Sequence, residues 1–139
     1  MLMKKLILTA LLPLTLLAGC QTQQVRSPDY PQLVFGQGAK SFLAIDSLTD
    51  GYTEGHLLRV SIQAVNASSS SKTLRYKFTW FDEAGFEINS LTSRWEALET
   101  APHEPITINR LATSPKAVSY KVFLSDAHAQ SPQPQGNNR

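Results

Sequence analysis

The feature that most constrains the fold is a strict alternation of apolar and polar residues in three separate stretches. The stretches 58–64, 74–80 and 118–124 each place an apolar residue at every second position, with mostly charged, amide or hydroxyl side chains between them. Because successive side chains of a β-strand point to opposite faces, this period of two predicts strands with one buried face and one wet face. Such strands are typical of antiparallel sheets. The middle stretch is the most aromatic, and Trp80 at its end is expected to contribute most to the core.

Shorter runs fill the intervals between these strands. Further strands are predicted from weaker alternation or short apolar runs at 33–35, 42–46, 86–88 and 106–108. Turn-forming residues separate the runs, as in Asp-Glu-Ala-Gly at 82–85, where the glycine supplies the positive φ of a short hairpin. About seven short strands at this spacing predict an all-β domain folded as an immunoglobulin-like antiparallel β-sandwich. The one helical turn is expected at 93–98.

The first 20 residues have the organisation of a bacterial export signal. Two lysines precede an apolar stretch at 6–18, which is shorter than the ~20 residues that a membrane-spanning helix needs. The four residues Leu-Ala-Gly-Cys at 17–20 resemble the lipobox of bacterial lipoproteins. That resemblance implies that residues 1–19 are a cleaved lipoprotein signal peptide. It also implies that Cys20 is lipidated and anchors the mature chain to a membrane.

Composition divides the rest of the chain into three parts. Residues 20–31 are polar with two prolines and predict a flexible tether, residues 32–126 hold the β-sandwich domain, and residues 127–139 are expected to form a disordered tail. At ~3.6 Å per residue the tether reaches roughly 40 Å at most, so the domain stays near the membrane. Gln21 stands where lipoproteins retained in the inner membrane tend to carry aspartate, which favours the outer membrane, facing the periplasm.

Charge and cysteine content exclude two classes of protein. The formal net charge of +2 comes from the two lysines of the export signal, so the mature chain is formally neutral. No run of lysine and arginine remains to follow a phosphate backbone, and no nucleic-acid partner is expected. Cys20 is the only cysteine, so no intramolecular disulfide can form and the domain depends on its core.

The stretch Leu-Arg-Tyr-Lys-Phe-Thr-Trp-Phe-Asp-Glu-Ala-Gly at 74–85 resembles the signature of YcfL-like small bacterial periplasmic lipoproteins. Val-Asn-Ala-Ser at 65–68, Trp95 and the strand at 120–124 fit the same pattern, so the resemblance covers roughly residues 40–125. It implies a sandwich-like domain in the periplasm whose function is uncharacterised. No catalytic residue can be carried over from it.

The sequence contains no recognised signature of catalysis. His56, His103 and His128 are scattered, and none has a second ligand at the spacing of a metal site. The serine run at 68–71 lacks the surroundings of an activated nucleophile, and the carboxylates around the 82–85 turn fit local hydrogen bonding. We therefore expect no catalytic residues, no metal and no cofactor, and predict that the protein is not an enzyme. An unrecognised hydrolase built from scattered residues is the weakest alternative.

Aromatic residues outside the core face are the candidate partner-binding residues. Phe81 and Phe123 each adjoin inward residues and so point to the opposite face, unless the end of the sandwich is covered on both faces. Trp95 is expected in a loop with Arg94 beside it. Exposed aromatic residues and arginine are favoured at protein interfaces.

Together these features predict a membrane-anchored envelope lipoprotein that acts as a non-catalytic protein-interaction module in the periplasm. Its expected partners are the membrane, through the lipid on Cys20, and an envelope protein, for which strand addition at a sheet edge is one mode of binding. The alternative is a cell-wall role, in which the exposed aromatic residues stack on peptidoglycan sugars.

Overall fold

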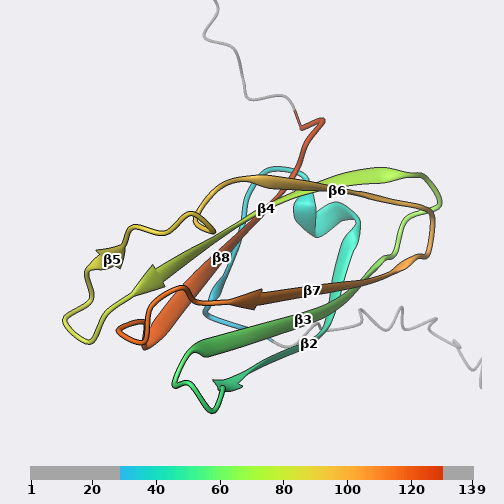
Figure 1. Cartoon of the computed structure of the whole chain (residues 1–139). Coiled ribbons are helices and arrows are strands. Elements are labelled where there is room, and N and C mark those ends of the chain that lie inside the picture. Colours follow the sequence, from blue (N-terminus) through green and yellow to red (C-terminus); the bar gives the residue numbers. More distant parts are fainter. Residues whose placement is uncertain (1–28, 130–139) are drawn as a thin grey trace, which may run out of the picture.

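The computed structural model describes residues 29–129 (Figure 1). The expected signal peptide, Cys20, most of the tether and the tail from residue 130 lie outside the described residues. The elements of the described part, in chain order, are β1 (Leu33–Phe35), a 3-10 turn η1 (Ala39–Ser41), β2 (Leu43–Tyr52), β3 (Leu58–Asn66), β4 (Lys72–Phe81), β5 (Glu87–Ile88), β6 (Glu96–Thr100), β7 (Pro105–Leu111) and β8 (Ser119–Asp126). None of the described elements is a helix that is long and apolar enough to cross a membrane.

Two sheets pack face to face, which confirms the predicted all-β sandwich (Figure 1). Sheet A has the order β1-β8-β4, with β5 and β6 both paired to the far edge of β4, and sheet B has the order β2-β3-β7. All pairings are antiparallel except that of β1 with β8, which is parallel. The parallel pair departs from the expected wholly antiparallel sheet. The chain crosses from β1 into sheet B through η1, so β1 pairs with the last strand of the chain instead of with β2.

The alternating stretches form the centre of both sheets. All the apolar positions of 58–64 and 74–80 are buried, and so are Tyr120, Val122 and Leu124 of β8. Trp80, Phe78 and Phe42 are the largest of the fully buried side chains, and the rings of Phe78 and Trp80 stack with centroids 5.7 Å apart. Val118 is the exception: it is 44% exposed, because β8 begins only at Ser119.

The prediction of a helical turn at 93–98 is wrong. Residues 91–95 form a loop, and the chain then enters β6, which pairs with β4 from Tyr76↔Glu96 to Lys72↔Thr100. Glu, Ala and Leu in this segment favour helix intrinsically. Pairing with the long β4 strand overrides that preference. β6 is thus an additional strand, and the described part of the chain has eight strands where about seven were expected.

The start of sheet A is fixed against β8 by two close glycines. Gly36 N–H donates to the Leu124 carbonyl at 2.7 Å, and Gly38 has a left-handed φ of 76°. A Cβ added at Gly38 would lie 2.8 Å from the Cβ of Asp126, so no larger residue fits without displacement. The chain is therefore held closely along β8 before it turns into η1.

Partly buried polar contacts connect the two sheets at their margins. The Tyr120 hydroxyl on sheet A donates to Asp50 Oδ2 on sheet B at 2.7 Å. At the opposite margin, Arg110 of β7 donates to the Tyr76 hydroxyl at 2.8 Å and also contacts Glu96 of β6. Burial raises the pKa of Tyr120 well above its usual range, with a further contribution from the hydrogen bond to Asp50. These contacts fix how the sheets face each other.

Asn66 closes the end of β3. Its side chain is fully buried, and its amide donates to the Ser70 and Ala101 carbonyls, both at 3.0 Å, and to Thr100 Oγ1 at 3.2 Å. Its carbonyl oxygen accepts from the backbone N–H and the hydroxyl of Ser68. The serine run after β3 is thus a turn built around Asn66.

Candidate functional site

The outer face of sheet A combines cations with aromatic rings. Inward residues of β4 alternate with Arg75, Lys77, Thr79 and Phe81, which point away from sheet B. The register places Lys77 opposite Phe123 of β8 and Arg75 opposite Ala97 of β6. The face is therefore built from the polar half of the same alternation that builds the core.

A compact group of side chains forms the centre of this face. The rings of Trp95 and Phe123 meet edge to face with centroids 6.5 Å apart, and the guanidinium carbon of Arg75 lies 5.0 Å from the Trp95 ring centroid. Lys77 stands between the strand positions of these rings, and Arg94 precedes Trp95 in the loop. We call these five residues, Arg75, Lys77, Arg94, Trp95 and Phe123, the outer-face cluster.

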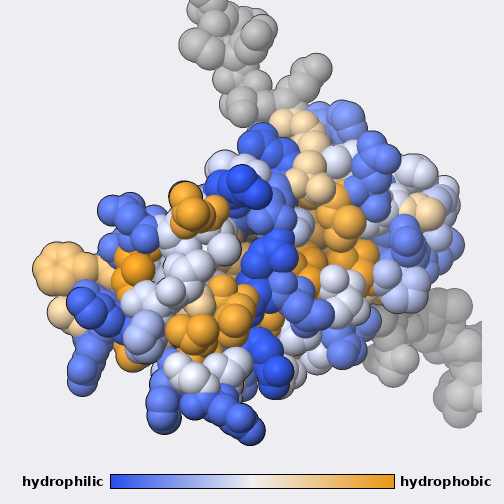
Figure 2. All heavy atoms as spheres, viewed as in Figure 1, coloured by the Kyte–Doolittle hydropathy of each residue, from blue (hydrophilic) through white to orange (hydrophobic). Residues whose placement is uncertain are grey.

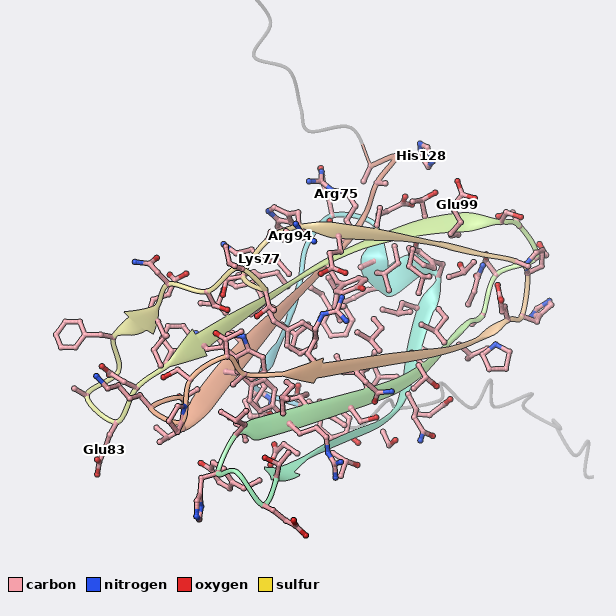
Figure 3. All side chains as sticks on the ribbon, in the orientation of Figure 1. Arg75, Lys77, Glu83, Arg94, Glu99 and His128 are labelled. Atoms are coloured by element: carbon pink, nitrogen blue, oxygen red, sulfur yellow. The ribbon has the colours of Figure 1, made fainter. Side chains whose placement is uncertain are left out.

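The cations of the outer-face cluster face solvent without a carboxylate partner among residues 29–129. The ion pairs in this part of the chain join Lys72 to Asp126 and Arg110 to Glu96, so neither involves the cluster. Figure 3 shows Arg75, Lys77 and Arg94 gathered on one side of the sheet, with Glu99 farther along β6. The cluster is a local positive region on a mature chain expected to be neutral.

The structure brings together three of the four predicted partner-binding residues. Arg94 and Trp95 are exposed, with Trp95 in the loop directly before β6, and Phe123 is half-buried in contact with Trp95. Phe81 lies apart, half-buried near the N-terminal end of β8. Sequence reasoning missed Arg75 and Lys77 as site residues. The signal was their position on the wet face of an aromatic strand, but only the register shows that they meet Trp95 and Phe123.

Phe81 lines a separate groove of about 440 Å³. The other lining residues come from the segment before β1, the β4–β5 turn and the start of β8: Pro31, Gln32, Gly85, Ser119, Tyr120 and Lys121. Lys121 lies two positions before Phe123 on the same face of β8, so the groove and the outer-face cluster are neighbours on this face. Phe81 therefore belongs to a neighbouring surface, not to the cluster.

One end of the sandwich presents isolated apolar side chains. Phe86 in the β4–β5 turn and Leu91 before β6 are 72% and 92% exposed. Figure 2 shows apolar atoms at the end of the molecule where β5 lies, separated from other apolar areas by hydrophilic atoms. Single exposed apolar residues are common on protein surfaces and identify no site by themselves.

The histidines occupy positions that fit turns. His56 and His103 have left-handed φ values of 57° and 58°, a conformation in which histidine is enriched. His128 Nε2 lies 3.4 Å from Thr73 Oγ1, but both are at the surface and no described group holds the other ring nitrogen. Residues 29–129 contain no group of three metal-ligating side chains.

Sheet B has a different outer face. Its hollow, of about 530 Å³, is lined by Thr49, Asp50, Gly51, Arg59, Ser61 and Asn109. These side chains are small or polar, and no aromatic residue is among them. Among the described residues, the hollow on sheet B thus lacks the combination of unpaired cations with aromatic rings that sheet A presents.

Comparison with known proteins gives a family without an assigned activity. A family model described as "Protein of unknown function (DUF1425)" matches residues 34–126. No curated protein matches the chain.

Two crystal structures share the fold. That of Campylobacter jejuni cj0090 has a TM-score of 0.58 at 18% identity, covering 68% of this chain and 97% of that one. The structure of a DUF1425 family member from Shewanella sp. pv-4 has a TM-score of 0.53 at 22% identity, and the match covers 59% of this chain and 75% of that one. At these identities the similarity concerns the fold alone.

Proposed function

This chain belongs to the DUF1425 family, whose description assigns no function, and we propose from its geometry that it is a non-catalytic protein-interaction module of the bacterial envelope. Within this family, the proposal also assigns the chain to the YcfL-like lipoproteins. It also includes lipidation of Cys20 and an outer-membrane location facing the periplasm, for which the Leu-Ala-Gly-Cys sequence at 17–20 and Gln21 are the support.

The outer-face cluster carries the proposal. Aromatic rings and arginine that remain at the surface supply most of the binding energy in many protein interfaces. Here Trp95 is 45% exposed, and it is fixed by Arg75 over its ring and Phe123 at its edge. A tryptophan that is already ordered loses little conformational freedom when a partner covers it.

Charge favours a partner with acidic groups. Each free guanidinium or ammonium of the cluster gains a charge-assisted hydrogen bond when a carboxylate approaches. Arginine binds a carboxylate through two parallel hydrogen bonds, so Arg75 and Arg94 would also orient the partner. An acidic surface of an envelope protein satisfies both the charges and the rings.

Peptidoglycan is the competing partner, because its sugars stack on aromatic faces. One face of Trp95 is already occupied by the guanidinium of Arg75, which leaves less of the ring for a sugar. The contact therefore favours the protein partner. The third alternative, a hydrolase, has as its best support the surface pair Thr73 and His128, which lacks a third orienting group among the described residues.

In-cell photo-crosslinking tests the proposal without removing the cluster. A photoreactive residue at Ala97, which is exposed and opposite Arg75, would sit beside Trp95. We expect one discrete envelope protein in the adduct, and loss of that adduct with Trp95→Ala or Arg75→Ala. A photoreactive residue at Thr107, exposed on sheet B, is the matched control and should give no such adduct.

The opposite result is equally specific. No protein adduct at Ala97, together with co-sedimentation of the intact lipoprotein with purified sacculi that Trp95→Ala abolishes, would replace the protein partner with the cell wall. Thermal unfolding of each variant confirms that the fold is intact.

A further inference from the structure

The β8 edge carries a regular series of hydrogen bonds that stops short of its N-terminal end. Val122 N–H donates to the Gln32 carbonyl at 2.9 Å, Gly36 N–H to the Leu124 carbonyl at 2.7 Å, and Asp126 N–H to the Gln37 carbonyl at 3.0 Å. Even-numbered residues of β8 therefore direct their backbone groups toward β1. On the other side, Ala127 N–H donates to the Thr73 carbonyl, as this alternation requires.

The next position in this series is Tyr120, and β1 does not reach it. The chain turns away at 30–33, where Leu33 N–H donates to the Tyr30 carbonyl at 3.0 Å. Within residues 29–129, no backbone or side-chain group bonds the N–H or C=O of Tyr120 on this side. The free end of the β8 edge thus presents one donor and one acceptor, which is what an added strand uses.

A second unpaired polar group belongs to Gln32, one of the residues that line the same groove. Gln32 Oε1 is buried and has no hydrogen-bond donor within the described part of the chain. Buried polar atoms are nearly always paired, so an unpaired acceptor beside an open strand edge indicates a missing donor. Phe81 supplies an apolar wall to the groove and Lys121 a cation at its mouth.

We propose that this groove binds an extended segment of the partner polypeptide, which adds to the free end of the β8 edge at Tyr120. The segment's backbone pairs with the N–H and C=O of Tyr120. The Gln32 side chain turns toward the segment, so that Oε1, which is shielded from solvent in the free protein, accepts from one of its N–H groups. An apolar side chain packs on Phe81, and an acidic one meets Lys121. This inference rests on the proposed interaction function and gives it a binding mode, since Lys121 joins the groove to the positive outer-face cluster.

The first test places a photoreactive residue at Ser119, which lines the groove and is exposed. We expect an adduct with the same envelope protein that is captured at Ala97, mapped by mass spectrometry to one continuous segment of that protein. Gln32→Leu and Lys121→Glu should each lower the yield at least roughly fivefold, which corresponds to about 1 kcal/mol. Gln37→Leu, outside the groove, is the matched control and should leave the yield unchanged.

A synthetic peptide covering the captured segment then serves as the probe in a direct measurement. Addition of this peptide to the intact lipoprotein in detergent should slow hydrogen exchange of the Tyr120 amide at least roughly tenfold, because strand addition protects that N–H. Unchanged exchange at Tyr120 during peptide binding would contradict pairing at the strand edge.

The crosslinking outcomes separate the two proposals. An adduct at Ala97 with none at Ser119 overturns the groove inference and leaves the interaction function standing. Absence of protein adducts at both positions overturns the interaction function. At Ser119, an adduct with lipid, with a second copy of this chain or with its own residues 20–28 overturns the assignment to a partner segment. Gln32→Leu is interpreted only if its melting temperature matches that of Gln37→Leu. If it does not, Lys121→Glu, which alters an exposed side chain, still tests the groove.

Discussion

The two faces of sheet A use aromatic residues in opposite ways. On the inner face, Tyr76, Phe78, Trp80 and Tyr120 are all at most 8% exposed, and successive rings along β4 and across to β8 contact one another. On the outer face, Trp95 and Phe123 contact each other, and Arg75, which lies over the Trp95 ring, has no carboxylate partner in the described part of the chain. The inner rings pack against one another, and their role is to build the core.

The difference identifies the side chains whose capacity for interaction is not used within the fold. Trp80 even places its polar atom within the fold, because its indole N–H donates to Thr92 Oγ1 at 3.3 Å. The outer rings and their cations have no comparable partner within residues 29–129, and burying them would stabilise a complex. Substitutions on the two faces should therefore separate stability from binding.

Trp80→Ala should have the largest effect on stability. Truncating this fully buried ring removes its apolar area and leaves a cavity between the sheets, at a cost of ~3–5 kcal/mol in the free energy of unfolding. Urea denaturation followed by circular dichroism measures the loss. An unchanged midpoint would break the comparison, because it would mean that the inner face does not depend on its aromatic residues.

Asn66→Ala extends the comparison to polar side chains. The change leaves the buried Thr100 hydroxyl without the amide donor of Asn66 and removes the acceptor for Ser68, so we expect a loss of ~2–3 kcal/mol. Asn109→Ala on the exposed face of sheet B is the control, expected within about 0.5 kcal/mol of the unaltered protein. Equal unfolding midpoints for the two variants would contradict the role of Asn66 in holding the turn.

Tyr120 supplies a pH test of the inner face. Its pKa is raised above the ordinary value near 10, first by burial and then by the bond to Asp50, so the folded state favours the neutral phenol. The resulting stabilisation is complete below pH ~10 and is lost as the pH rises through the higher folded pKa. Tyr120→Phe should cost about 1 kcal/mol at pH 7 and flatten the decline in stability above pH ~10.

The exposed Tyr52 provides the control for this titration. Tyr52→Phe alters a side chain that is 55% exposed and should preserve the steep alkaline decline. The role of Tyr120 would be contradicted if both phenylalanine variants kept the same alkaline slope in thermal unfolding.

Trp95→Ala should have the smallest effect on stability. The ring lies outside the core, so the loss is expected below ~1 kcal/mol, while crosslinking to the partner at Ala97 is abolished. Differential scanning calorimetry and the crosslinking assay give the two readouts. A loss of several kcal/mol would assign Trp95 to the fold and remove the distinction between the faces.

Periodicity predicted the sandwich because it reports burial directly. The inward residues of 58–64 and 74–80 alternate without exception, so their strands could be located from the sequence. β6 was missed because Leu98 is its single well-packed apolar residue and Glu96 turns inward to meet Arg110. An ion pair between two sheets leaves no mark on the local sequence.

The site was only partly predictable for a related reason. Trp95, Arg94 and Phe123 could be selected as aromatic and arginine residues off the core face. Their grouping depends on how β4 pairs with β6 and β8, which sets Arg75 and Lys77 among them. Phe81 could not be separated from the group by sequence, because its place in the groove depends on where β1 begins.

The parallel pairing of β1 with β8 also has a mechanical consequence. A pull on the chain from its N-terminal side reaches the sandwich at β1. If it is directed along the strand axis, it would shear the bonds between β1 and β8 together instead of opening them one at a time. β8 is also the strand that carries Phe123 and borders the groove at Tyr120. Tension between the N-terminal side of the chain and a partner bound at Phe123 or in the groove would therefore pass through β8.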